Sequence, residues 1–449
     1  MKTFHTFLYF LCGLPVVAAD WPNWLGPSHN GVSNESNWNN DLENSLWKSK
    51  VGVGFSAVVV SKGRLFTMGH DGNKLNGRES VYCLDVKTGK SIWTDSYSAP
   101  LIDYLHEGGP CSTPTVDDDN LYSISKHGLL NAYLVNTGKK IWSTDMLALS
   151  GMKKPPEWGF SASPYVLENL LLIEAGATYA LDKTNGKVLW KSEDYRPAYG
   201  SPLSFTFRKK TLIAILKTDG LVILDAQNGK TLDFVKWETS YRTNSSTPII
   251  RDNKIFISTG YRRGCALFEW TGSSLHKIYE NKNLSTHMNH AILVGDYLYG
   301  FDGNVHMSGP KDFTCIQFST GEEQWRVSDK GLQVGSLLVA GERIIALGQR
   351  GELVIARVNN QRFDEINRDQ VMRGKCWTMP VLANSKLYLR NARGDLFCID
   401  LEKTVSKRKS CVVSRSFGQR VEKFQELKEA IANYCLNASE KIRSESLIA

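Results

Sequence analysis

One short pattern recurs along this chain and constrains its fold more than any other feature. The clearest copies read VYCLDVKTGKSIW at 81–93, LNAYLVNTGKKIW at 130–142 and TYALDKTNGKVLW at 178–190. Weaker copies lie at 221–234, 265–279, 313–325 and 353–366, and a truncated copy lies at 396–401. Such a recurrence indicates a repeat architecture, in which each unit packs against the next.

Each copy has the features of a β-hairpin. An alternating apolar strand leads into a turn such as Lys87-Thr88-Gly89-Lys90, and a second strand ends at a large aromatic residue. Glycine permits the positive φ at which the chain reverses, and the aromatic ring can pack on the neighbouring unit. The turn glycines are Gly89, Gly138, Gly186, Gly229 and Gly321. Another apparent hairpin precedes every copy, most clearly at 112–125, so each unit has the four strands of a propeller blade.

The repeat predicts an all-β, eight-bladed β-propeller with four-stranded blades. Eight units fill residues 51–401, but the eighth lacks its last strand after LFCIDL. Near the other end of the chain, Asn44-Ser45-Leu46-Trp47-Lys48 resembles the last strand of the other units. We expect residues 20–50 to supply the missing strand, because closure of the ring removes an open sheet edge.

The two ends of the chain fall outside the repeat. Residues 1–19 combine a positive start, an apolar stretch and small residues before Asp20, which predicts a cleaved signal peptide and a periplasmic or extracellular protein. Residues 402–449 begin as a basic linker and continue with apolar residues three or four apart, which predicts an amphipathic α-helix. This helix either packs on the propeller or docks to a partner or an anionic membrane surface. A Cys411–Cys435 disulfide would tie it to its linker.

Composition excludes several classes of protein. The net charge of +8 is too small and too dispersed to predict nucleic-acid binding. The chain has no internal apolar run long enough for a transmembrane helix. Cys83, Cys315 and Cys398 lie in strand-like runs, so we expect small buried hydrophobes there. We expect a monomer.

The repeats resemble the pyrroloquinoline-quinone-type (PQQ-like) repeat, whose core reads Ala/Cys-x-Asp-x-x-Thr-Gly-Lys-x-x-Trp. The matching residues of the first unit are Asp85, Thr88, Gly89, Lys90 and Trp93. The segment DWPNWLGPSHNGVS is similar to the start of exported bacterial proteins of this family, with Leu25 where arginine is commoner. The resemblance covers about residues 20–401 and implies a quinoprotein-like propeller. Relatives of this kind include quinoprotein dehydrogenases and the outer-membrane-protein assembly factor BamB, which is a scaffold.

A dehydrogenase of this family would hold the quinone, a calcium or lanthanide ion and a carboxylate base, and the methanol-dehydrogenase type adds a disulfide between adjacent cysteines. This chain has no adjacent cysteines, and its acidic run Asp117-Asp118-Asp119 falls in an expected hairpin turn. His287 and His290 have no acidic neighbour in sequence, so we expect no metal site. We therefore expect no catalytic residue and no cofactor, with PQQ and calcium as the alternative.

A ligand site is expected at the mouth of the ring. In a propeller, the loops that lead into the inner strands share one face with the turns in the middle of each blade, and loops on a rigid scaffold commonly carry sites. The candidate ligand-binding residues in these segments are Glu107, Trp158, Tyr261, Arg262, His287, Arg350, Trp377 and Arg393. Arginine and tryptophan suit an anionic or sugar-like ligand, through charge-assisted hydrogen bonds and stacking.

These features favour an exported propeller that binds an envelope protein or a small ligand without catalysis. A quinone-dependent oxidoreductase acting on alcohols or sugars is the first alternative. Polysaccharide recognition is the second.

Overall fold

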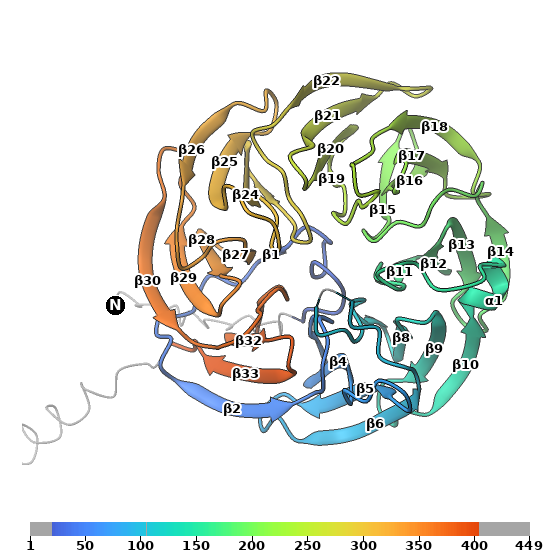
Figure 1. The fold of residues 1–449 in the computed structure, drawn as a ribbon, viewed down its shortest axis with the longest axis horizontal. Helices are drawn as coiled ribbons and strands as arrows, with labels where there is room; N and C mark the ends of the chain where they lie inside the picture. Colours follow the sequence, from blue (N-terminus) through green and yellow to red (C-terminus); the bar gives the residue numbers. More distant parts are fainter. Residues whose placement is uncertain (1–19, 105, 404–449) are drawn as a thin grey trace, which may run out of the picture. The chain divides into compact units, whose positions relative to one another are not determined.

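The structure is a computed structural model that describes residues 20–104 and 106–403. Its strands form eight sheets arranged around one axis, as Figure 1 shows. This arrangement confirms the expected all-β, eight-bladed propeller with four-stranded blades. The expected signal peptide, basic linker, amphipathic helix and Cys411–Cys435 disulfide lie outside the described residues.

Within a blade the strands follow one another from the axis outward, except that the last strand of blade 8 comes from the N-terminal segment. Blades 1 and 2 consist of β3 (Val59–Ser61), β4 (Arg64–His70), β5 (Arg78–Asp85), β6 (Ser91–Ser98), β7 (Thr115–Asp117), β8 (Asn120–Ile124), β9 (Leu129–Leu134) and β10 (Lys140–Asp145), which is followed by the short helix α1 (Met146–Ser150). Blades 3 and 4 consist of β11 (Tyr165–Leu167), β12 (Leu170–Ala175), β13 (Ala177–Asp182), β14 (Val188–Lys191), β15 (Leu203–Phe207), β16 (Lys210–Leu216), β17 (Gly220–Asp225) and β18 (Thr231–Lys236).

The second half of the ring has the same organisation. Blades 5 and 6 consist of β19 (Ile249–Arg251), β20 (Lys254–Thr259), β21 (Gly264–Trp270), β22 (Leu275–Asn281), β23 (Ile292–Val294), β24 (Tyr297–Asp302), β25 (Asp312–Gln317) and β26 (Glu323–Val327). Blade 7 consists of β27 (Ser336–Ala340), β28 (Arg343–Leu347), β29 (Glu352–Arg357) and β30 (Asp364–Gln370), with β1 (Val32–Ser33) added beside β27. Blade 8 consists of β31 (Val381–Ala383), β32 (Lys386–Arg390), β33 (Asp395–Asp400) and β2 (Ser45–Lys50).

The middle strands of each blade are buried, because every sheet packs between two neighbouring sheets. In β12 all residues after the first are buried, whereas the outer strand β14 is mostly exposed. This difference in burial explains why the sequences of the middle strands are nearly continuous apolar runs, whereas those of the outer strands mix apolar and polar residues. Cys83, Cys315 and Cys398 are buried free cysteines in such strands, as expected.

The glycine and the tryptophan of the repeat meet across blade boundaries. All five turn glycines predicted to have a positive φ do so, at values between 66° and 74°. A Cβ atom placed on Gly138 of blade 2 would lie 2.6 Å from Cδ2 of Trp93 in blade 1. The Trp93 indole N–H donates to the carbonyl of Val135 in blade 2 at 2.9 Å. The tryptophan of one blade therefore covers the hairpin turn of the next, and only glycine leaves room for it.

We expect Gly138→Ala to lower the free energy of unfolding by about 3 kcal/mol, since it combines an unfavourable positive φ with displacement of a packed indole. Gly63→Ala is the matched control, because Gly63 also has a positive φ of 75° but has no atom within 4 Å of its added Cβ. The control should lose only about 1 kcal/mol. Urea unfolding measures both variants, and equal losses would show that the contact with Trp93 carries no energy.

Strand β2 closes the ring as expected. It pairs antiparallel with β33 over residues Ser45–Lys50. Trp47 on β2 packs over Gly89 of blade 1 and donates its indole N–H to the carbonyl of Val86 at 2.9 Å. The contact between tryptophan and glycine is therefore repeated where the ring closes.

The rest of the N-terminal segment crosses the axis of the ring, where Figure 1 shows it in blue. Trp21 pairs with Val60 at the end of β3 in blade 1, and β1 runs parallel to β27 in blade 7, two blades away around the closed ring. Between these two points, the indole N–H of Trp24 donates to Thr247 Oγ1 of blade 5 at 3.3 Å. Since β1 and Trp21 pair with the ends of inner strands just before the first turn of their blades, this segment covers the end of the axis opposite the mouth.

Buried charged side chains join neighbouring blades. Lys217 of blade 4 contacts Glu174 of blade 3 at 2.6 Å, and both side chains are fully buried. Burial raises the pKa of Glu174 and lowers the pKa of Lys217, and the attraction between the two charges opposes both shifts. Arg390 of blade 8 donates instead to the carbonyl oxygens of Ser56 and Met68 at 2.7 and 2.6 Å. Loss of one partner from such a pair leaves a buried charge uncompensated.

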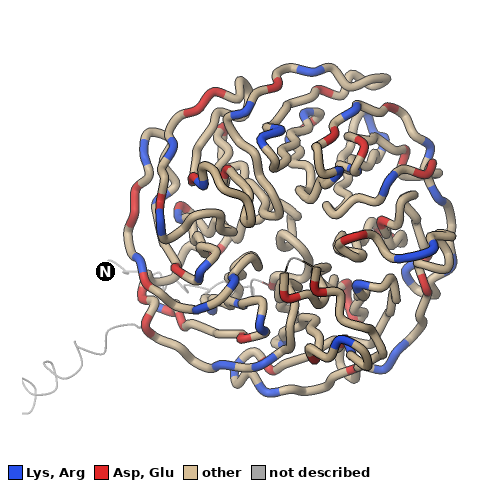
Figure 2. The backbone as a smooth tube through the Cα atoms, in the orientation of Figure 1, with Lys and Arg blue, Asp and Glu red and all other residues tan. Residues whose placement is uncertain are grey.

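Charges of both signs are distributed over all the blades, as Figure 2 shows. Such mixing agrees with the small net charge of +8. Within residues 20–104 and 106–403, no helix has the length and apolar character needed to span a membrane.

Candidate functional site

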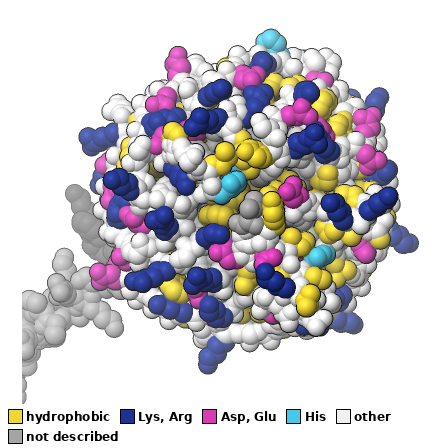
Figure 3. All heavy atoms as spheres, in the orientation of Figure 1, with side chains coloured by type: hydrophobic (Ala, Val, Ile, Leu, Met, Phe, Trp, Pro, Cys, Tyr) yellow, Lys and Arg dark blue, Asp and Glu magenta, His cyan; other side chains and the backbone are white. Residues whose placement is uncertain are grey.

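A pocket lies on the axis at one end of the ring, and we call it the central pocket. It is lined by Trp24 of the N-terminal segment, by loops that lead into the inner strands of every blade but the seventh, and by mid-blade turns of blades 5 and 6. It spans about 1070 Å³, counting the part that is open to solvent. In Figure 3, apolar side chains and a histidine gather around the axis, and most Lys and Arg side chains lie farther out. This end of the ring is the mouth.

One wall of the central pocket is a group of aromatic rings, the tryptophan cluster, formed by Phe55, His106, Trp158 and Trp377. Phe55 stacks on Trp377 with ring centroids 5.2 Å apart, and His106 stacks on Trp158 at 5.6 Å. Phe55 also meets His106 edge-on at 5.1 Å, which joins the two pairs. The rings come from loops that precede blades 1, 2, 3 and 8, which are neighbours because the ring closes between blades 8 and 1. They offer faces on which a flat ligand can stack.

A second group, the histidine cluster, consists of Tyr261, His287 and His306. The Tyr261 hydroxyl lies 3.1 Å from Nε2 of His287, and the rings of His287 and His306 are 5.0 Å apart. His287 is only 5% exposed, and its Nδ1 has no hydrogen-bond partner among the described residues. Because buried polar atoms are normally satisfied, this nitrogen is a candidate contact point for a bound molecule or an ordered water.

Burial favours the neutral form of these imidazoles. It lowers the pKa of His106 and that of His287 to about 3, and it lowers the pKa of His306 as well. The positive charges of Lys126 and Lys375 add to the effect on His106. The residues lining the central pocket include no Asp, Glu, Lys or Arg. At neutral pH the pocket therefore presents rings, hydroxyl groups and uncharged imidazoles.

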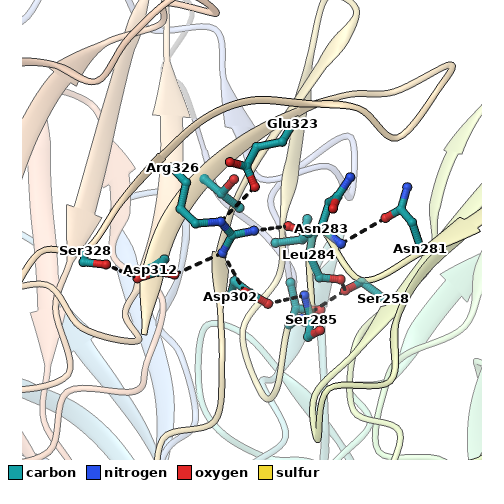
Figure 4. Close-up of polar contacts among 12 residues, drawn as sticks. Ser258, Asn281, Asn283, Leu284, Ser285, Asp302, Asp312, Glu323, Arg326 and Ser328 are labelled. Atoms are coloured by element: carbon teal, nitrogen blue, oxygen red, sulfur yellow. Dashed lines mark hydrogen bonds and ion pairs between the residues drawn. The ribbon is translucent and has the colours of Figure 1, made fainter. Parts of the chain in front are cut away.

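A polar network in blade 6 fixes the loop that carries His287, as Figure 4 shows. Arg326 on β26 contacts Asp302 at 2.7 Å and donates to the carbonyl of Asn283 at 2.7 Å. Asp302 in turn accepts a hydrogen bond from the backbone N–H of Ser285 at 2.7 Å. The backbone just before His287 is thus held by charge-assisted bonds, which fix the position of the imidazole.

A second pocket, the arginine pocket, lies beside the central pocket and shares Trp377 with it. It spans about 1210 Å³, counting the part that is open to solvent. Its lining residues are Glu107, Val305, Gln349, Arg350, Gln370, Arg373, Gly374, Lys375, Trp377 and Arg393. Most of them come from the mid-blade turns of blades 7 and 8 and from the loop that joins these blades.

The structure brings most of the predicted ligand residues to the mouth. The central pocket includes Trp158, Tyr261, His287 and Trp377, and the arginine pocket includes Glu107, Arg350, Trp377 and Arg393. Arg262 is exposed and lines neither pocket. It follows Tyr261 in a tight turn where both residues have a positive φ, and only the tyrosine faces the pocket. The role of these residues in binding stays a prediction.

The sequence analysis missed Trp24, Phe55 and Arg373. Trp24 belongs to the DWPNW segment, and its position on the axis depends on contacts with blades far away in sequence. Phe55 precedes the first inner strand, where an aromatic residue among glycines was the available signal. Arg373 stands two residues before Lys375 and could have been found from that basic loop.

The lining of the central pocket contains one sulfur nucleophile and no carboxylate. Its one sulfur nucleophile, Cys111, is a partly exposed free cysteine whose Sγ lies 3.8 Å from Nζ of Lys126. No carboxylate stands in its lining to serve as a general base. The part of the chain that the structure describes contains no group of three or more side chains suited to hold a metal ion.

Comparison with known sequences gives matches in two different parts of the chain. A family model described as outer membrane protein assembly factor BamB matches residues 35–146 and 77–327. The outer membrane protein assembly factor BamB of Shewanella oneidensis is 23% identical over 348 residues, which cover 72% of this chain and 78% of that protein. The impB/mucB/samB family C-terminal domain matches residues 408–449, which lie outside the described residues.

Solved structures share the propeller fold. The structure of BamB from Moraxella catarrhalis has a TM-score of 0.58 and 16% identity, and the match covers 79% of this chain and 99% of that one. Quinohemoprotein alcohol dehydrogenase from Comamonas testosteroni has a TM-score of 0.61 and 11% identity, and the match covers 86% and 81%. Since the fold is common to an assembly factor and an enzyme, function has to be argued from the site.

Proposed function

Because the chain belongs to the outer membrane protein assembly factor BamB family of PQQ-like repeat propellers, we propose that it is an exported binding or scaffold protein of the cell envelope that performs no chemistry. The uncharged, aromatic central pocket carries this proposal. It offers ring faces, hydroxyl groups and neutral imidazoles for recognition but no carboxylate base. The name of the Shewanella relative supports a place in the envelope, and the sequence pattern of residues 1–19 supports export.

The alternative is a quinone-dependent oxidoreductase, which the likeness to quinohemoprotein alcohol dehydrogenase suggests at the level of the fold. Pyrroloquinoline quinone carries carboxylates, and calcium is bound by oxygen ligands with carboxylates prominent among them. A site for both would therefore combine basic and acidic side chains. The lining of the central pocket contains neither. The adjacent arginine pocket supplies basic side chains but a single carboxylate, Glu107, which is paired with Lys375, so the lining lacks the free carboxylates that would hold the metal beside the quinone. This mismatch supports binding without chemistry.

The test compares partner capture by aromatic variants of the mouth. Tagged protein is cross-linked in intact envelopes of the source organism, and the proteins that co-purify with it are quantified. We expect the Trp158→Ala/Trp377→Ala double variant to lose at least roughly thirtyfold of the affinity for its partner, because truncating even one central aromatic contact costs about 2 kcal/mol. Phe234→Ala is the control, since Phe234 is an aromatic residue on the outer strand β18 that is 38% exposed.

Two outcomes would contradict the proposal. Equal capture by the double variant and the parent protein would place the binding surface away from the mouth. Reduction of a dye by the parent protein with added quinone, calcium and an alcohol or aldose, at a rate lowered by Trp158→Ala, would favour the oxidoreductase.

A further inference from the structure

The arginine pocket carries more positive charge than its own side chains neutralise. Across the described residues, the side chains of Arg350, Arg373 and Arg393 form no hydrogen bond or ion pair. Lys375 is the basic residue of this pocket that has a partner, Glu107, at 3.0 Å. Some arginines elsewhere in the described ring are paired, such as Arg326, which contacts three carboxylates. Exposed arginines such as Arg262 and Arg362 also have no side-chain ion pair with a described residue, but they stand apart from this pocket, whereas Arg350, Arg373 and Arg393 surround it together.

Three unpaired guanidinium groups around one pocket create a positive potential that attracts an anion. Guanidinium is planar and donates two parallel hydrogen bonds to a carboxylate, a phosphate or a sulfate. The ligand of this pocket is therefore expected to carry such an oxyanion. Its charge would supply the ion-pair partner that the side chains of Arg350, Arg373 and Arg393 lack among the described residues.

The position of Trp377 shows what else the ligand should carry. This residue lines both pockets, and Nζ of Lys375 lies 5.1 Å from the centre of its ring. An anion held by the arginines is therefore adjacent to the tryptophan cluster. A molecule that reaches into both pockets needs an uncharged ring on one side and an oxyanion on the other.

Unsatisfied polar atoms indicate that this molecule also carries hydroxyl groups. Oε1 of Gln349 in the arginine pocket and Nδ1 of His287 in the central pocket are buried and have no partner among the described residues. An amide oxygen needs a donor, and an imidazole nitrogen accepts a donor or donates according to its tautomer. The hydroxyl side chains that also line the central pocket are Ser161, Ser163, Ser201, Thr243, Ser245, Thr247 and Thr378.

We propose that the two pockets form one binding site for an acidic saccharide. The C–H groups on one face of its sugar ring pack on the electron-rich faces of Trp158 and Trp377, and its hydroxyl groups bond to Gln349 and His287. Its carboxylate lies among the arginines. This inference rests on the proposed binding role of the mouth and names the class of ligand that the mouth takes.

The test measures binding of trigalacturonic acid and of its fully methyl-esterified form to the full chain by isothermal titration calorimetry. The ester keeps the sugar rings and removes the charge. We expect the acid to bind at least roughly tenfold more tightly, with an affinity that falls as salt rises. Arg350→Gln and Arg393→Gln should each weaken binding of the acid about tenfold and leave binding of the ester unchanged. Trp377→Ala should weaken both.

Arg362→Gln is the matched control. Arg362 is an exposed arginine in the turn between β29 and β30, at the end of blade 7 away from the mouth, because successive turns of an antiparallel sheet alternate ends. Its substitution should change neither affinity. A sulfated neutral trisaccharide, run in parallel, tells whether the arginines prefer sulfate or carboxylate.

Equal binding of acid and ester, no binding of either, or an unchanged affinity in both arginine variants would overturn the saccharide proposal. Equal or tighter binding of triglutamate with the same dependence on Arg350 and Arg393 would assign the site to an acidic peptide instead. If partner capture still depends on Trp158 and Trp377 in any of these cases, the proposed scaffold role stands and only the ligand class fails.

Discussion

Removal of residues 20–50 is expected to prevent the ring from folding as a cooperative unit. The deletion removes the buried side chains of Trp21, Trp38 and Trp47, which are 2%, 0% and 8% exposed. Truncation of one buried tryptophan costs about 3–5 kcal/mol, so three such losses approach or exceed the total stability of about 5–15 kcal/mol of an ordinary domain. The deletion also leaves β33 as an open sheet edge. Calorimetry should show no cooperative transition where the parent protein unfolds.

Single substitutions on β2 measure how much the packing of its side chains stabilises the ring while the strand itself stays in place. Trp47→Ala should lower the free energy of unfolding by about 3–5 kcal/mol and keep one cooperative transition. Leu46→Ala on the same strand is the control, because Leu46 is 42% exposed and its loss should cost at most about 0.5 kcal/mol. A deletion variant that melts at the temperature of the parent would show that the ring does not need its N-terminal strand.

The architecture was predictable because the repeat encodes contacts that recur at one spacing. Four of the five turn glycines receive the tryptophan of the preceding blade, and Gly321 receives Tyr279, so one motif records both a local conformation and a contact between blades. The same logic located β2, since Trp47 occupies the position of Trp93 and Trp142. A residue that both sets a turn and contacts the neighbouring blade recurs at the same place in each repeat, so its pattern can be recognised in a single sequence.

The base of the central pocket and its detailed lining were not predictable in the same way. Trp24 reaches the axis through one bond to Thr247, 223 positions away, and no repeat encodes that contact. Tyr261 and Arg262 are adjacent in the same turn, yet only Tyr261 lines a pocket. The topology placed the right loops at the mouth, but the direction of each side chain depends on local φ values and on packing that the sequence pattern does not contain.

Acid is expected to destabilise the ring well above the pH at which its carboxylates titrate. Burial lowers the pKa of His287 and that of His290 from 6.5 to about 3. Between these values the folded state binds fewer protons at these histidines than the unfolded state does, so their contribution to stability is constant above pH 6.5 and falls as the pH drops toward 3. In this range each of these histidines lowers the free energy of unfolding by about 1.4 kcal/mol for every unit by which the pH falls. His29 and His106, whose pKa values burial lowers to about 4 and about 3, act in the same direction.

Buried and partly buried carboxyl groups oppose this trend, because burial raises the pKa of Glu35, Glu79, Glu174 and Asp302. Burial raises the pKa of Glu79 from 4.5 to about 7, so its protonated form adds stability that is complete below pH 4.5 and is lost as the pH rises through 7. Hydrogen bonds and ion pairs to the charged forms of Glu35, Glu174 and Asp302 limit their shifts, and the shift of Glu79 offsets about one of the four histidines. Urea unfolding between pH 7.5 and pH 4.5 should therefore show a net loss of stability on acidification. His290→Gln should reduce the slope of the free energy of unfolding against pH by about 1.4 kcal/mol per pH unit. His276→Gln is the control, because His276 is exposed on the outer strand β22 and should leave the slope unchanged. A His290→Gln slope equal to that of the parent would mean that His290 takes up a proton as readily in the ring as in the unfolded chain.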